Sequence, residues 1–252
     1  MDYAQARLQA QFGERPDESV WQKLEAAPEP SVALEIARSS GLRRWVAGIT
    51  PHADSHAIEI ALRAGWRECV SEIATWMPGR WQPALLWTRG LVDLPALWHL
   101  GRGGAPLPWV LRDPVLQVYA RADPKTLEVM LREACGASLG SAREDAGGTV
   151  LPDSACPSHI LQAWLDEWRR RWPRRSDTAS LEDLARLFDA AMKQPAAMGR
   201  NDLARKLRSL FRRSVLHPVA AFIYIAFVTL DIERLRAGLL KHRLARDGVI
   251  AS

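Results

Sequence analysis

Apolar residues recur along most of the chain at steps of three and four positions. This spacing places side chains on one face of a helix. The clearest stripe lies between positions 51 and 78 and contains Ile58, Leu62, Trp66, Cys69, Val70, Ile73, Trp76 and Met77. Pro51 suits the first turn of such a helix, and Pro78 with Gly79 ends it. Comparable patterns in the other segments predict an all-α fold, a multi-helix array.

The longest predicted helix closes the chain and runs from about Pro218 to Leu244. Its first part, VAAFIYIAFVTL over residues 219–230, is apolar on all sides, whereas the part after Asp231 is amphipathic. A helix that is apolar all round is typically buried. The apolar run is also shorter than the roughly 20 residues needed to cross a bilayer. We therefore expect the first half of this helix to be the most buried element of the C-terminal region.

One long segment lacks helical periodicity. The sequence between Gly136 and Pro157 is rich in Gly, Ser and Ala, which is typical of a loop or linker. We expect a flexible linker over residues 136–157, with an N-terminal helical domain over 1–135 and a C-terminal helical domain over 158–252. Residues 80–123 hold several Trp and Pro residues, so their helices are expected to be short.

Charge and cysteine content narrow the function classes. The chain has 34 Lys and Arg against 29 Asp and Glu, a mild excess of +5, and three Cys with no CxxC pair. An odd number of cysteines argues against a disulfide framework, and the missing CxxC argues against a zinc site. The N-terminus has no secretory signal pattern. These features predict a cytoplasmic protein.

Two denser basic patches, residues 169–175 and 205–213, interrupt an otherwise even distribution of arginine. A dedicated nucleic-acid-binding protein concentrates its basic residues on one face or tail. We therefore expect the exposed sides of amphipathic helices here, and we do not expect nucleic acid as the main partner. An acidic protein partner would explain the patches equally well.

A GxSxG string at residues 136–140 is the best catalytic candidate. Ser138, Asp153 and His159 follow the chain order of an α/β-hydrolase triad. A nucleophile elbow, however, requires a strand immediately before the serine, and the residues before Gly136 are spaced as in a helix. We interpret the string as part of the flexible loop, and we do not expect an enzyme.

His52 and His56 have the spacing of two ligands on one helix face, with Asp54 between them. Ala53 stands where a metalloprotease helix has its glutamate, so no base for activating water follows the first histidine. We expect a histidine pair without metal, and no cofactor. The tryptophans at 66, 76, 164 and 168 fall on apolar stripes, so core packing is preferred to a stacking platform for bases or sugars.

The C-terminal string from His217 to Ile250 resembles the closing helix of one family, the C subunits of bacterial and archaeal V/A-type ATPases, whose counterpart in the vacuolar proton pump is the d subunit. The matching positions are Pro218, Tyr224, Asp231, Leu235 and Arg236. The N-terminal string DYAQARLQAQFG is similar to that family's opening helix through Tyr3, Ala6 and Arg7. Asp231 stands where Glu is usual and Arg234 where Asn is usual. The chain is also shorter than the three-domain members, so one domain is expected to be abbreviated.

The resemblance implies a non-catalytic adapter. Such proteins sit on the cytoplasmic mouth of a membrane rotor ring and hold the tip of the central shaft, so this chain would be peripheral to the membrane through its partners. The candidate partner-interface residues are Arg205, Arg208, Arg212, Arg234 and Arg236. Burial of the Leu235 turn against the core is the alternative for the last two. A helical nucleic-acid-binding or protein-interaction module that uses basic helix faces remains the alternative function.

Overall fold

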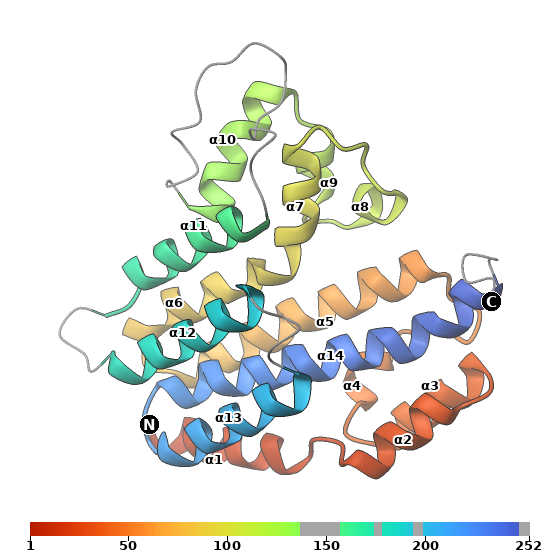
Figure 1. Ribbon diagram of the computed structural model, residues 1–252, viewed down its shortest axis with the longest axis horizontal. Coiled ribbons are helices and arrows are strands. Elements are labelled where there is room, and N and C mark those ends of the chain that lie inside the picture. Colours follow the sequence, from red (N-terminus) through yellow and green to blue (C-terminus); the bar gives the residue numbers. More distant parts are fainter. Residues whose placement is uncertain (137–156, 174–177, 194–198, 247–252) are drawn as a thin grey trace. The chain divides into compact units, whose positions relative to one another are not determined.

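The protein is helical throughout the part that the structure describes. The computed structural model describes residues 1–136, 157–173, 178–193 and 199–246, and no strand occurs among them (Figure 1). The expectation of an all-α fold is confirmed. None of the described helices combines the length and the apolar character that a bilayer crossing requires.

The chain divides into two compact units. Unit 1 consists of Met1–Met77 and Arg200–Ser252, and unit 2 of Pro78–Gly199. Unit 1 contains α1 (Asp2–Gly13), α2 (Glu18–Ala26), α3 (Pro30–Arg38), α4 (Arg43–Val46), α5 (Ser55–Trp76), α13 (Arg200–Arg213) and α14 (Val219–Arg246). Unit 2 contains η1 (Gly79–Trp81), α6 (Gln82–Trp87), η2 (Thr88–Asp93), α7 (Leu94–Gly101), α8 (Pro108–Arg112), α9 (Gln117–Ala120), α10 (Pro124–Cys135), α11 (Pro157–Arg170) and α12 (Ala179–Lys193).

This division differs from the linker boundary expected at residues 136–157. Helices α10 and α11, which precede and follow that segment, pack against each other, and both pack against α7. Gly136 takes part in this packing, because a Cβ at this position would lie 2.8 Å from the carbonyl oxygen of Ala163. Its φ of +105° also favours glycine. The composition of the segment signalled the end of a helix but carried no information on which helices pack together.

Helix α14 is the central element of unit 1. It contacts α13, α5, α3 and α1, and Figure 1 shows it lying alongside α5. Residues 219–228 are all buried, as the all-round apolar pattern predicts. Further along, Leu235 and Leu239 remain buried while Glu233 and Ala237 are exposed. The change from a buried to an amphipathic helix near Asp231 is therefore confirmed.

Aspartate caps determine where several helices begin. The side chain of Asp17 accepts a hydrogen bond from the backbone N–H of Val20, and Asp123 accepts bonds from Lys125 and Thr126. Asp54 accepts one from Ala57 at 2.6 Å, so α5 begins at Ser55. Such caps satisfy backbone donors that the first turn leaves unpaired. The prediction that this helix includes Pro51 is therefore wrong by four residues.

A tryptophan stack lies in the core of unit 2. The Trp164 ring lies 6.1 Å from the rings of Trp87 and Trp168, with an interplanar angle of 20° in both pairs. Trp172 meets Trp168 edge-on at 5.1 Å. Trp87 donates from Nε1 to the backbone oxygen of Trp164. Trp164 and Trp168 are 4% and 2% exposed, so these two are core residues, as their spacing predicted, whereas Trp76 of the same predicted set is only partly buried.

Candidate interaction surface

The five candidate arginines lie on α13 and α14, two helices that pack against each other in unit 1. Arg205, Arg208 and Arg212 belong to α13, and Arg234 and Arg236 belong to α14. The two groups differ in their exposure to solvent. The α13 residues are exposed, whereas both α14 residues are partly buried.

Helix α13 separates its apolar and basic residues onto opposite sides. Leu207, Leu210 and Phe211 are buried, and Phe211 stacks on Phe12 of α1 at 4.7 Å. The exposed side carries Arg205, Lys206, Arg208, Arg212 and Arg213. Arg205 pairs with Asp202 at 2.7 Å. The other four cations, Lys206, Arg208, Arg212 and Arg213, form no ion pair with any described residue; we call them the α13 basic face.

Arg234 is held by two acidic residues of α2. Its guanidinium donates to Glu18 at 2.7 and 2.9 Å and to Glu25 at 2.6 Å, and it lies 4.9 Å from the centre of the Trp21 ring. Its side chain is 15% exposed. Hydrogen bonds from Arg234 lower the pKa of both glutamates, and the bond to Glu18 raises the pKa of Arg234. Arg234 therefore joins α14 to α2.

Arg236 also has an internal partner. It forms an ion pair with Glu59 of α5 at 2.9 Å, and Glu59 also accepts a hydrogen bond from Arg63 at 2.7 Å. Leu235, between the two arginines, is fully buried. The turn around residues 234–236 thus secures α14 to α2 and α5. The part of the predicted interface that stays exposed is on α13.

Replacing Arg234 with methionine is expected to weaken the pH dependence of stability. The pKa values of Glu18 and Glu25 lie below their ordinary value of 4.5 in the folded protein. A lowered carboxyl pKa adds stability that is complete above the ordinary value and is lost as the pH falls through the lowered value. Because both glutamates are exposed, we expect a change of about 1 kcal/mol in the free energy of unfolding. Urea titrations above and below pH 4.5 measure it.

Arg186→Met is the matched control, since this exposed arginine pairs with Asp183 within one helix at 2.5 Å. An Arg234→Met protein that loses as much stability on acidification as the unmodified chain would contradict the assignment.

One buried ion pair was not predicted as a pair. Arg15 donates to both carboxylate oxygens of Asp231, at 2.7 and 2.8 Å, and its guanidinium lies 4.3 Å from the centre of the Phe227 ring. The two side chains are 17% and 11% exposed. Burial raises the pKa of Asp231, and Arg15 opposes this shift. The sequence signal was an acidic residue immediately after a twelve-residue apolar run.

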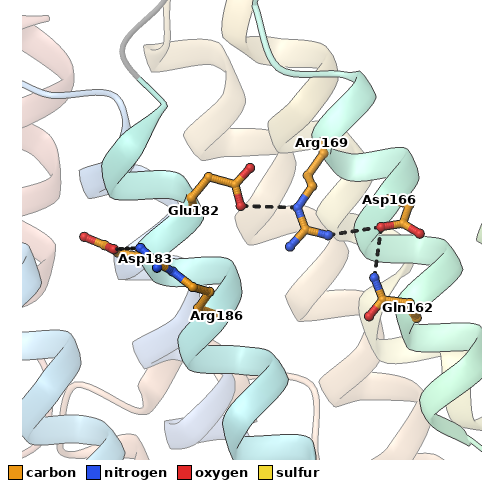
Figure 2. A network of polar contacts seen from close by, with 6 residues as sticks. All are labelled: Gln162, Asp166, Arg169, Glu182, Asp183 and Arg186. Atoms are coloured by element: carbon orange, nitrogen blue, oxygen red, sulfur yellow. Dashed lines mark hydrogen bonds and ion pairs between the residues drawn. The ribbon is translucent and has the colours of Figure 1, made fainter.

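In the second basic patch, residues 169–175, the described arginines pair with acidic residues of α11 and α12. Arg169 lies between Asp166 at 3.1 Å and Glu182 of α12 at 3.4 Å, and Gln162 donates to Asp166 (Figure 2). Arg170 and Arg171 both pair with Glu167. Its last two arginines, at positions 174 and 175, lie outside the described residues. This patch differs from the α13 basic face, whose cations form no ion pair within the part of the chain that the structure describes.

A shallow groove of about 460 Å³ lies between α10 and α11. It is lined by Val129, Arg132, Glu133, Gly136, Glu167 and Arg171. Its two arginines pair with glutamates one turn away, Arg132 with Glu128 and Arg171 with Glu167. The groove therefore presents balanced charge.

The other candidate chemistry has little structural support. Ser138 and Asp153 lie outside the described residues, as does the side chain of His159, while the residues up to Cys135 form a helix, as their spacing predicted. His52 lies in the turn before α5, so His52 and His56 do not share a helix face. Among the described residues, no three His, Cys, Asp or Glu side chains are grouped so as to hold a metal ion.

Two cysteines are buried thiols. Burial raises the pKa of Cys69 and of Cys135 to about 12. Both thiols are therefore protonated at neutral pH and are poor nucleophiles. They contribute as small apolar core residues.

Comparison with protein families, with curated proteins and with solved structures finds no match in any of the three.

Proposed function

We propose that the protein is a non-catalytic adapter subunit of a rotary V/A-type ATPase, which couples the central shaft to the membrane rotor ring. The proposal starts from the resemblance of two strings, one at each end of the chain. It is supported most by one observation: these two strings pack together in a single compact unit.

Three contacts join the N-terminal segment to the closing helix. Arg15, just after α1, binds Asp231 of α14 through two hydrogen bonds. Gln5 of α1 accepts a hydrogen bond from the backbone N–H of Leu216, just before α14. Phe12 of α1 packs edge-on against Phe227 at 5.1 Å. Tyr224, Asp231 and Leu235 of the closing string are buried in unit 1, whereas Tyr3, Ala6 and Arg7 of the opening string are exposed.

The architecture of unit 1 suits a part that transmits force. A helix of 28 residues, buried over residues 219–228, contacts four others, and Arg234 and Arg236 secure its second half to α2 and α5. Buried apolar contacts and charged hydrogen bonds raise the free energy needed for local opening. A torque-transmitting adapter needs such resistance, and it needs no cofactor. In this proposal the chain reaches the membrane through its partners.

Pull-down experiments with the tagged full-length chain test the adapter role. The rotor ring in detergent and the central-shaft proteins, encoded by the same genome, are offered separately and together. We expect each to be retained and the three to form one complex. Retention should persist at moderate salt, because a stable interface buries a large apolar core in addition to its charges.

A tagged helical protein of similar size and charge is the control for non-specific retention. Capture of the ring without the shaft, or of the shaft without the ring, would contradict the coupling role. Failure to retain either would contradict membership of the complex.

A further inference from the structure

The α13 basic face is concentrated at the C-terminal end of its helix. Arg208 and Arg212 are one turn apart, and Arg213 follows directly in the last turn. Because Leu207, Leu210 and Phe211 occupy the opposite side, the cations point away from the core. Positive charge in the last turn complements the helix dipole, but that contribution does not require four cations.

Two exposed aliphatic residues follow this face directly along the chain. In the turn between α13 and α14, Val215 is 57% exposed and Leu216 is 50% exposed. The turn is well defined, because Ser214 donates to the backbone oxygen of Phe211 and His217 donates to that of Ser214. Aliphatic side chains are therefore displayed on an ordered turn directly beside the basic residues.

The backbone of this turn is strained at its apolar tip. Leu216 has a φ of +60°, a left-handed conformation that bulky residues rarely adopt, and it is the only non-glycine residue of positive φ in the described part of the chain. Gln5 holds it there through the bond from the Leu216 N–H. Glycine would fit this position with less strain. An exposed leucine at such a position suggests that its side chain has a use.

We propose that the α13 basic face and the Val215–Leu216 turn dock on an anionic phospholipid bilayer. The cations meet lipid phosphates, and the two aliphatic side chains enter the boundary between headgroups and acyl chains. Clustered basic residues beside exposed apolar ones are the combination that binds membrane interfaces. The inference goes beyond the adapter role and does not depend on it.

Other anionic partners fit the apolar tip less well. Nucleic acid would use the same arginines, but single-stranded binding surfaces add aromatic side chains for base stacking, and this turn offers Val and Leu. An acidic protein would need a complementary apolar pocket for the turn. A bilayer accepts a protruding aliphatic side chain without such a pocket.

Vesicle co-sedimentation of the full-length chain tests the proposal. We compare phosphatidylcholine vesicles with and without phosphatidylglycerol and expect binding that requires the anionic lipid and weakens with salt. Arg212→Ala with Arg213→Ala should reduce the affinity about 30-fold. Val215→Ser with Leu216→Gly should reduce it roughly tenfold, through lost apolar burial. The glycine also relieves the strained backbone, so a folding defect is not expected.

The matched control removes two exposed arginines elsewhere, through Arg80→Ala with Arg121→Ala. An equal loss in this control would show attraction by net charge alone and would overturn the proposal. Unchanged binding of the Val215→Ser, Leu216→Gly protein would overturn it as well. So would binding to a mixed-sequence DNA duplex that exceeds vesicle binding and disappears in the Arg212→Ala, Arg213→Ala protein, because that result assigns the face to nucleic acid.

Discussion

Replacing Asp231 with asparagine is expected to destabilise unit 1 by about 3 kcal/mol, because Arg15 would keep its charge in a buried site without a counter-ion. The position of the Arg15 guanidinium over the Phe227 ring compensates only part of the lost carboxylate. Hydrogen exchange read by mass spectrometry should show faster exchange in α1 and α14, with little change in unit 2.

Replacing the other member of the pair, Arg15, changes the pH dependence of stability in a different way. Arg15→Met leaves the Asp231 carboxylate unpaired at neutral pH, and burial already raises the pKa of this group. A carboxyl whose pKa is raised by folding favours the folded state at low pH, and this contribution is lost as the pH rises through the raised value. The loss in free energy of unfolding caused by Arg15→Met should therefore shrink on acidification. The loss caused by Asp231→Asn should not shrink.

The double variant Arg15→Met with Asp231→Leu separates charge from packing. Replacing both members of a buried pair with apolar residues is often nearly neutral, because the desolvation cost of both charges disappears. We expect the double variant to be more stable than either single variant. If the two single variants and the double variant all lost the same free energy of unfolding, the site would depend on shape and not on the pairing of charges.

Helix positions were predictable because they depend on local information. The apolar run of residues 219–230 indicated its own burial. The start of α5 was misplaced because two local signals compete there. Pro51 is favourable in a first turn, but the Asp54 side chain caps the Ala57 N–H and thereby sets the boundary.

Tertiary relations were predictable only in part. Arg234 and Arg236 look like exposed basic residues in the sequence, and their partners Glu18, Glu25 and Glu59 lie far away along the chain. The spacing of apolar residues along the chain does not predict ion pairs between such distant positions. The same holds for the two units, since residues 1–77 and 200–252 are joined by packing across a long separation. The α13 residues Arg208 and Arg212 were identified as exposed because amphipathicity is a property of one helix.

Removing the central ring of the tryptophan stack is expected to destabilise unit 2 by about 4 kcal/mol, the range for truncating a buried aromatic residue to alanine. Trp164 is 4% exposed and stacks on both Trp87 and Trp168. Its replacement by alanine removes two ring contacts at once and leaves a cavity between α6 and α11. Hydrogen exchange should become faster in α6, α7 and α11, and the midpoint of urea unfolding should fall.

Trp164→Phe and Trp98→Ala are the controls for this prediction. Phenylalanine keeps an aromatic ring between its neighbours, so less than half of the deficit is expected. Trp98 is only partly buried and meets the guanidinium of Arg102 at 5.2 Å, so its loss should also be smaller. Equal deficits for Trp98→Ala and Trp164→Ala would mean that the stack contributes no more than an ordinary half-buried tryptophan. In that case the stability of unit 2 would have to come from the aliphatic contacts of α7 and α10.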